Sequence, residues 1–269
     1  MELKDLALQI VTIAKQAGAE IMEVYDHYQD IGVQHKSDNS PLTIADQKAN
    51  DIIVAGLKGL AIQYPIISEE NKAIPFEERQ SFTRVWMVDP LDGTKEFIKR
   101  NGEFTVNIAL LEEGKSILGV IYAPALNLTY WAAQGVGAFK EEDGGFVSIS
   151  AHEFNLDQKG VRIVCSRSHL NTATQACVDA FEEPKLVPTG SSLKIALVAE
   201  GAADFYPRLG PTMEWDIAAA QVILEEAGGT LVELVNHLPL KYNRADMLNP
   251  HFLAFGKTDV EKLFNKVSL

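Results

Sequence analysis

Two stretches near the N-terminus carry apolar residues at steps of three and four, the spacing of amphipathic helices. In the first stretch the apolar positions are Leu3, Leu6, Ile10, Ile13, Ala17, Ile21, Val24 and Tyr28. In the second they are Ala49, Ile52, Ile53, Leu57 and Leu60. Between the two, Val33 opens a strand-like segment and Asp38 lies in a polar turn. Thr43 and Asp46 form a Thr-x-x-Asp arrangement that resembles a capping box, so we predict that the second helix begins at Thr43 with Asp46 in its first turn.

The middle of the chain shows the two-residue alternation and short apolar runs that are typical of β-strands. The predicted strands are 65–68, 85–88, 104–110, 117–122, 128–132 and 137–140. In the strand 104–110, apolar residues alternate with Thr105, Asn107 and Ala109. The polar stretch 71–83 is predicted to be a surface connection.

A polar zone at 151–160 separates this region from one in which strands and helices alternate. Strands at 161–165, 186–188 and 204–206 alternate with helices at 171–181 and 192–200, and a helix at 214–227, strands at 230–234 and 251–255, and a helix at 259–267 follow. We therefore predict two halves. Residues 1–150 have an α+β order, and residues 151–269 have the β-α-β-α-β order of a layered α/β unit.

The composition is that of a globular protein with an acidic surface. The chain has 269 residues and 29.6 kDa, with 46% hydrophobic and 23% charged residues, which is enough to bury a large core. The formal net charge of −13 and the pI near 4.9 argue against binding to a nucleic acid polymer or an anionic membrane, because both would be repelled. An anionic substrate would need metal ions or a local basic patch.

The N-terminal residues lead directly into the helical pattern and show no signal peptide. No apolar run approaches the ~18 residues that span a bilayer, so we expect a soluble, cytoplasmic protein. Cys165 and Cys177 lack CxxC spacing, which favours two reduced structural thiols over a disulfide or a zinc site. The oligomeric state is left open.

The strongest candidate for chemistry is the segment Asp89-Pro90-Leu91-Asp92-Gly93-Thr94, which follows the apolar run 85–88. It is predicted to be a strand end, a turn and a helix start with two carboxylates. Asp89 and Asp92 are hard oxygen donors that suit Mg²⁺, while the N–H groups of Gly93 and Thr94 would face an anion. The same residues also fit an ordinary Asp-Pro turn with a helix cap.

Other acidic residues also stand at the ends of predicted elements. They are Asp38, Asp46, Glu69, Glu70 and Asp216. Adjacent glutamates are typical of a solvated edge, but Glu69 ends one strand and Asp89 ends the next. If these carboxylates converge, cations must neutralise their repulsion. Two Mg²⁺ or Mn²⁺ ions ~3.5–4 Å apart would clamp the oxygens of a phosphoryl transfer, which indicates a metal-dependent phosphatase.

Other enzyme classes lack their signatures in this chain. The six histidines show no HxxxH or HExxH spacing, which argues against a zinc hydrolase. The sequence also has no GxSxG elbow, no GxxxxGK[ST] phosphate loop and no GxGxxG dinucleotide motif.

Four motifs in order resemble the inositol monophosphatase superfamily across nearly the whole chain. They are the segments 36–46, 68–70, 89–94 and 214–220. The resemblance implies a layered α-β-α-β-α sandwich. It also implies that the metal ligands are Glu69, Asp89, the Leu91 carbonyl, Asp92 and Asp216. Asp46 and Thr94 would activate the attacking water, and the Gly93 and Thr94 amides would hold the scissile phosphate. Glu70 would act indirectly, through the residues that bind the metals, or would bind a third metal ion.

Within the superfamily, the second half resembles the branch of CysQ-type 3′(2′),5′-bisphosphate nucleotidases. The residues that carry this likeness lie in 190–194 and 204–216. It implies hydrolysis of adenosine 3′,5′-bisphosphate to AMP and phosphate, with two or three Mg²⁺ ions, in sulfur metabolism, and lithium sensitivity. Glu69, Leu91, Asp92, Gly93, Thr94 and Asp216 would touch the substrate near the metals. Ser191, Ser192, Lys194 and Arg208 would bind the rest of the nucleotide.

Other interpretations stay open at this stage. Lys194 and Arg208 also fit a solvated lysine and an arginine paired with a neighbouring carboxylate. The same fold would serve an inositol monophosphatase or an enzyme like fructose-1,6-bisphosphatase. A haloacid-dehalogenase phosphatase is disfavoured, because its two aspartates are separated by one residue, whereas two residues separate Asp89 from Asp92. A catalytically silent binding protein is the remaining alternative.

Overall fold

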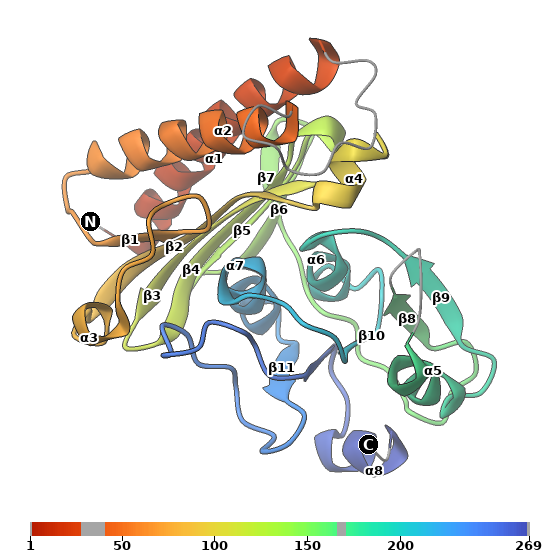
Figure 1. Ribbon diagram of the computed structural model, residues 1–269. Coiled ribbons are helices and arrows are strands. Elements are labelled where there is room, and N and C mark those ends of the chain that lie inside the picture. The colour runs from red at the N-terminus through yellow and green to blue at the C-terminus, as the bar shows by residue number, and fades with distance from the viewer. Residues whose placement is uncertain (1, 28–40, 166–170, 268–269) are drawn as a thin grey trace.

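The computed structural model describes residues 2–27, 41–165 and 171–267, and they form five alternating layers of helix and sheet (Figure 1). Helices α1 (Leu3–His27) and α2 (Pro41–Lys58) cover one face of a large sheet, while α6 (Leu193–Ala199) and α7 (Glu214–Glu226) cover the other. Beyond them lies a smaller sheet, whose outer side carries α5 (Thr172–Asp179) and α8 (Val260–Val267). The predicted α-β-α-β-α sandwich is confirmed.

Within the described residues, the large sheet has seven strands in chain order. They are β1 (Ile66–Ser68), β2 (Arg84–Asp92), β3 (Thr105–Glu112), β4 (Lys115–Ala123), β5 (Leu128–Ala133), β6 (Gly137–Glu142) and β7 (Gly145–Ser148). β1 runs parallel to β2, and every later neighbour is antiparallel. A 3₁₀ turn (Pro124–Leu126) joins β4 to β5, and α4 (Thr94–Ile98) follows β2.

The smaller sheet has five described strands in the order β11-β12-β10-β8-β9. Their bounds are β8 (Arg162–Cys165), β9 (Lys185–Pro188), β10 (Phe205–Arg208), β11 (Thr230–Glu233) and β12 (Phe252–Phe255). β8, β9 and β10 are parallel, as expected for strands joined by the crossover helices α5 and α6, and β12 is antiparallel to both of its neighbours. The chain passes from one sheet to the other between 149 and 161, close to the predicted boundary at 150.

Three apolar clusters fill the spaces between the layers, because successive residues of a strand point to opposite faces. In β2, Trp86 and Val88 join the cluster under α1 and α2, whereas Val85 and Met87 join the cluster around α6 and α7. A third cluster, which includes Leu263, lies between the smaller sheet and the outer helices. The strands β2, β3 and β4 of the large sheet are thus buried on both faces.

Helix α7 lies unusually close to the large sheet. A Cβ atom built at Gly119 in β4 would stand 2.3 Å from the carbonyl oxygen of Ala219, so only glycine fits there. The run of small residues Ala218, Ala219 and Ala220 on α7 is fully buried at this contact. The close packing fixes the N-terminal end of α7, and Asp216 with it, against the ends of the central strands.

Most predicted elements are confirmed within a few residues, and three boundaries are corrected. Helix α2 begins at Pro41, so Thr43 lies inside its first turn and is not the cap. Strand β2 continues to Asp92, and α4 begins at Thr94. The connection 71–83 contains the short helix α3 (Phe76–Arg79). The predictions for Tyr28, Val33 and Asp38 lie outside the described residues.

Both cysteines have free, buried thiols, as predicted. Burial raises the pKa of Cys177 to about 11, so its thiol is inert at neutral pH. None of the described helices combines the length and the apolar composition needed to cross a bilayer.

Candidate metal and substrate site

Two parallel strand ends place the first acidic residues side by side. Ser68, the last residue of β1, is opposite Val88 of β2, and the Glu69 N–H donates to the Val88 carbonyl oxygen at 3.2 Å. Glu69 therefore stands next to Asp89 at the carboxyl end of β1. Asp89 is 1% exposed, whereas Glu69 is exposed.

An irregularity in β2 brings Asp92 to the same place. The pairing of β2 with β3 shifts register between Asp89 and Asp92, at Pro90, which has no N–H to donate. The Leu91 N–H instead donates to Asp89 Oδ1 at 3.1 Å. Gly93 then has a φ of 102°, and a Cβ there would stand 3.1 Å from the Phe104 Cα, so this turn requires glycine.

Asp216 completes the cluster from the first turn of α7. Its Oδ2 accepts a hydrogen bond from the Met213 N–H at 2.9 Å, which ties the carboxylate to the start of the helix. Oxygen atoms of Asp89, Asp92 and Asp216 lie within 4.8 Å of one another. The structure therefore gathers three residues that are separated by up to 127 positions in the sequence.

Burial and mutual repulsion dominate the electrostatics of this cluster. Burial raises the pKa of Asp89 well above its usual value, and the carboxylates of Asp92, Glu69, Asp216 and Asp46 raise it further. For Asp216, burial followed by the Asp92 charge raises the pKa to about 7, although the Met213 N–H and Arg208 oppose this shift. Four carboxylates thus bear on Asp89 in a setting that disfavours negative charge.

Helix α2 brings Asp46 to the cluster. Asp46 is 4% exposed, and its charge is among those that raise the pKa of Asp89. One turn later, Asn50 Oδ1 accepts a hydrogen bond from Ser68 Oγ at 2.7 Å, which fastens α2 to the end of β1. Thr94, at the start of α4, and Glu70, beside Glu69, are half-buried.

The donor set fits a hard divalent cation. Mg²⁺ prefers carboxylate and carbonyl oxygens, and a cation would cancel the repulsion that raises the Asp89 and Asp216 pKa values. Asp89 is also too deeply buried for water to screen its charge. The described carboxylates therefore form a cluster that is suited to a metal ion.

A small cavity beside the cluster brings the predicted metal and nucleotide residues together. Its lining is Asp92, Ser191, Ser192, Lys194, Ile195, Tyr206, Arg208, Thr212, Asp216 and Ile217. All four residues predicted to bind the rest of the nucleotide are in this lining, next to two predicted metal ligands. Tyr206 and Thr212 were not predicted from the sequence.

Within the part of the chain that the structure describes, the two cations of the cavity donate hydrogen bonds only to backbone carbonyl oxygens. Lys194 Nζ donates to the Ser191 carbonyl oxygen at 2.8 Å, and Arg208 Nη2 donates to the Pro211 carbonyl oxygen at 2.7 Å. Arg208 Nε is buried and has no hydrogen-bond partner among the described residues. A buried donor without a partner is costly, and an anionic ligand would satisfy it.

Comparisons with known proteins settle the family. The sequence model of the inositol monophosphatase family matches residues 2–260. The chain belongs to the inositol monophosphatase family. Its membership confirms the family predicted from the motifs, and with it the prediction of a phosphatase.

Within the family, the chain resembles the branch that the motifs indicated. The 3′(2′),5′-bisphosphate nucleotidase CysQ of Escherichia coli K12 is 46% identical over 245 residues, which cover 91% of this chain and 97% of that protein. The protein of the same name from Haemophilus influenzae is 38% identical, and the aligned residues cover 92% of this chain and 91% of that protein.

Solved structures agree with this placement. The crystal structure of CysQ from Bacteroides thetaiotaomicron has a TM-score of 0.83 and 40% identity, covering 95% of this chain and 98% of that one. An inositol monophosphatase from Zymomonas mobilis has a TM-score of 0.79 at 22% identity, with both chains covered fully, and this likeness concerns the fold alone.

A polar network around Glu214, at the start of α7, was not predicted from the sequence. Glu214, two residues before Asp216, is 0% exposed and pairs with Arg244 Nε at 3.0 Å. Its carboxylate also accepts the backbone N–H groups of Asn243 at 2.6 Å and Arg244 at 3.2 Å. In this family member, the loop 242–249 therefore wraps the start of α7.

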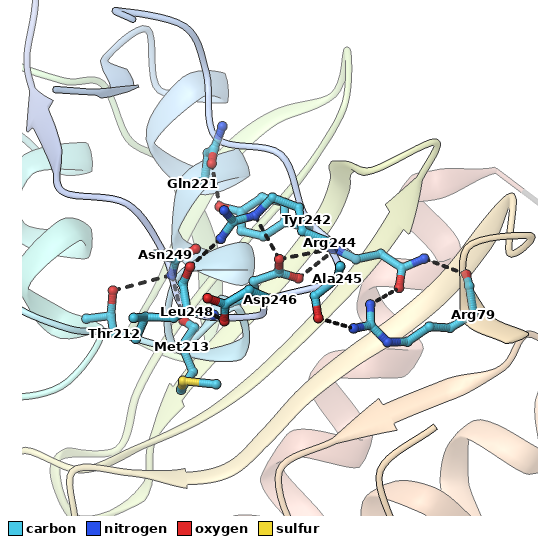
Figure 2. A network of polar contacts seen from close by, with 12 residues as sticks. Arg79, Thr212, Met213, Gln221, Tyr242, Arg244, Ala245, Asp246, Leu248 and Asn249 are labelled. Carbon is cyan, nitrogen blue, oxygen red and sulfur yellow. Dashed lines mark hydrogen bonds and ion pairs between the residues drawn. The ribbon is translucent and has the colours of Figure 1, made fainter. Parts of the chain in front are cut away.

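Arg79 connects this loop to the first half of the chain. It is 3% exposed and donates to Asn243 Oδ1 at 2.9 Å and to the Ala245 carbonyl oxygen at 3.1 Å (Figure 2). On the other side of the loop, Asn249 Nδ2 donates to the Met213 carbonyl oxygen at 2.7 Å (Figure 2). An Arg in a polar stretch gives no signal of burial, so sequence reasoning had no means of finding this connection.

Proposed function

We propose that this protein is a Mg²⁺-dependent phosphatase that removes the 3′-phosphate of adenosine 3′,5′-bisphosphate to give AMP and phosphate. The observation that carries the proposal is that the lining of one cavity includes both Asp92 and Asp216 of the acidic cluster and the cations Lys194 and Arg208. An acidic cluster suits metal ions and one phosphate, and two cations suit a second phosphate. The 46% identity to proteins named 3′(2′),5′-bisphosphate nucleotidase supports the same substrate.

The metal ligands in this proposal are Glu69, Asp89, the Leu91 carbonyl oxygen, Asp92 and Asp216. Asp89, at 1% exposure, is the most deeply buried carboxylate of this set and would hold metal together with the others. When bound, two or three Mg²⁺ ions, or Mn²⁺ in their place, would supply charge neutralisation and a more acidic water. Glu70 would support Glu69 or serve the third ion.

Asp46 and Thr94 would move the proton of the attacking water. Thr94 accepts this proton as its own hydroxyl hydrogen passes to Asp46. Asp46 is suited to this task because its buried carboxylate lies among the other acids and is fixed by α2. The N–H groups of Gly93 and Thr94 would orient the phosphate for in-line attack.

Ser191, Ser192, Lys194 and Arg208 would bind the remainder of the nucleotide. Arg208 is the strongest of these assignments, because its Nε is a buried donor that awaits an acceptor. Lys194 would leave the Ser191 carbonyl oxygen for a phosphate, exchanging a neutral acceptor for a charged one.

A substrate panel with Mg²⁺ tests the proposal. We expect kcat/KM for adenosine 3′,5′-bisphosphate to exceed the values for inositol monophosphate and fructose 1,6-bisphosphate by at least about 10²-fold. The reason is that Lys194 and Arg208 are assigned to the remainder of the nucleotide, which the other two substrates lack. A preference for inositol phosphate or fructose 1,6-bisphosphate would overturn the substrate assignment. No Mg²⁺-dependent phosphate release from any of them would favour a silent binding protein.

Trapping experiments test the reaction type. Direct attack by water leaves no phosphate on the enzyme, so acid-quenched protein should carry no aspartyl-phosphate. Covalent phosphate on Asp89 would contradict the proposal. Lithium sensitivity and a cytoplasmic location remain predictions.

A further inference from the structure

Strand β3 carries two buried polar side chains directly beside the aspartates of β2. Thr105 is opposite Asp92 and Asn107 is opposite Asp89 in the antiparallel pairing. Thr105 is 0% and Asn107 1% exposed, on a strand whose other residues are mostly apolar. Buried polar groups of this kind need hydrogen-bond partners, and their partners reveal what they do.

The partners lead from β3 to Asp92 through two serines. Thr105 Oγ1 contacts Ser191 Oγ, and Asn107 Nδ2 donates to Ser192 Oγ at 2.9 Å. Ser191 Oγ in turn lies 2.6 Å from Asp92 Oδ2, and Ser192 Oγ lies 3.1 Å from the same oxygen.

Hydrogen counting gives this chain a direction. Asn107 Nδ2 has no lone pair, so the Ser192 oxygen must accept, and its one hydrogen points to Asp92 Oδ2 or to the Asp216 carbonyl oxygen 2.6 Å away. Ser191 gives its hydrogen to Asp92, because an ionised carboxylate can only accept. Its oxygen can then accept from Thr105, whose hydroxyl also lies 3.0 Å from Asn107 Oδ1.

We propose that Thr105 and Asn107 are positioning residues for Asp92: they hold the Ser191 and Ser192 oxygens beside Asp92 Oδ2 and leave the other carboxylate oxygen of Asp92 for a metal ion. This inference rests on the metal site of the proposed function. It also changes the role of the serines: besides lining the cavity, they orient a metal ligand. Neither Thr105 nor Asn107 is in the cavity lining, so they act through the serines and not on the substrate.

The test compares two buried threonines of the same sheet. Thr105→Val removes the hydroxyl and keeps the shape. The matched control is Thr129→Val on β5, since Thr129 is also 0% exposed and donates to a carboxylate, Glu141 Oε2, at 2.6 Å. Partners of metal ligands typically contribute 10–100-fold to metal affinity. We therefore expect Thr105→Val to weaken Mn²⁺ binding to the substrate-free protein by about 10-fold or more, measured by calorimetric titration.

The remaining outcomes are specified by further variants. Thr129→Val should leave Mn²⁺ affinity unchanged, and Thr105→Ser, which keeps the hydroxyl, should restore it to within about threefold. Asn107→Ser should weaken Mn²⁺ binding as Thr105→Val does. If Thr105→Val does not fold, the pair Thr105→Ser and Thr105→Ala makes the same comparison. Equal Mn²⁺ affinities for the Thr105 and Thr129 valine variants would overturn the inference.

Phosphate release separates this inference from the proposed function. With adenosine 3′,5′-bisphosphate, Thr105→Val should require about 10-fold more Mg²⁺ for half-maximal rate, with little change in substrate KM at saturating Mg²⁺. A wild-type protein that binds Mn²⁺ but releases no phosphate would refute the proposed reaction. The positioning of Asp92 would then be decided by the calorimetric comparison of Mn²⁺ affinities alone. An active wild type with no Mn²⁺ difference between the variants would refute the positioning alone.

Discussion

Asp89 and Glu214 are both buried carboxylates, yet their surroundings have opposite charge. Burial raises the pKa of both. Around Glu214 the contributors that follow lower the pKa again, namely the backbone N–H groups of Arg244 and Asn243 and the Arg244 charge. Around Asp89 the contributors that follow are all carboxylates, and they raise its pKa further.

The difference separates a structural acid from a functional one. Glu214 is balanced by the chain itself, so its role is complete in the folded protein. Asp89 is surrounded by negative charge in a buried position, and folding into such a site is unfavourable without a cation from outside. The protein accepts this cost at the place where a metal would bind, which is typical of functional sites.

The largest expected effect is on turnover when Asp89 loses its charge. Asp89→Asn keeps the shape and can still accept from the Leu91 N–H, but it removes a proposed metal ligand. Several kcal/mol of transition-state stabilisation should be lost, so kcat should fall by at least about 10³-fold in phosphate-release assays. Near-normal turnover at ordinary Mg²⁺ concentrations would contradict the proposed role of Asp89 as a metal ligand.

The next effect concerns stability and has the opposite pattern. Glu214→Gln replaces one carboxylate oxygen with an NH₂ group, which would face either the Asn243 N–H or the Arg244 donors, and it removes the negative charge that pairs with Arg244. We expect a loss of about 3 kcal/mol in the free energy of unfolding, measured with urea in the presence of a chelator. Asp89→Asn should be at least as stable as the wild type under the same conditions. A large loss for Asp89→Asn and none for Glu214→Gln would reverse our assignment of the two roles.

Mg²⁺ should then stabilise only proteins with an intact cluster. At 100 times its dissociation constant, a ligand that binds one site of the folded state adds about 2.7 kcal/mol. We expect this gain in the wild type and a much smaller one in Asp89→Asn, measured as the shift in urea midpoint on adding Mg²⁺. An equal shift in both proteins would place the stabilising metal elsewhere.

On the other side of the cavity, the cation Lys194 lacks a negatively charged partner among the described residues, as Asp89 lacks a positively charged one. Lys194 is held by a neutral carbonyl oxygen, and a phosphate would be the anion that completes it. Lys194→Ala should raise KM for adenosine 3′,5′-bisphosphate by about 10-fold, roughly 1.4 kcal/mol, and change KM for a small monophosphate little. An equal effect on both substrates would remove Lys194 from recognition of the second phosphate.

The sequence predicted the parts of the site that local patterns encode. Asp89 and Asp92 stand at a strand end beside turn residues, and the motif with Asp216 could be named before its geometry was known. The convergence of Asp216 with Asp89 depends on the contact of α7 with Gly119, which no local pattern shows.

The features that could not be predicted from the sequence depend on which side chains the tertiary structure buries. Glu214 and Asp216 are two residues apart and of the same charge, yet one is paired with Arg244 and the other faces the cluster. Thr105 and Asn107 fit the polar face of an ordinary strand. They are buried because the large sheet is covered on both sides.

We infer that Mg²⁺ supplies the positive charge that is lacking around Asp89 and thereby completes a phosphatase. The most direct measurement is phosphate release from adenosine 3′,5′-bisphosphate by protein freed of metal with a chelator and then titrated with Mg²⁺. We expect no phosphate release above background without Mg²⁺ and full recovery of release on titration. Release that is unaffected by the chelator would contradict this inference.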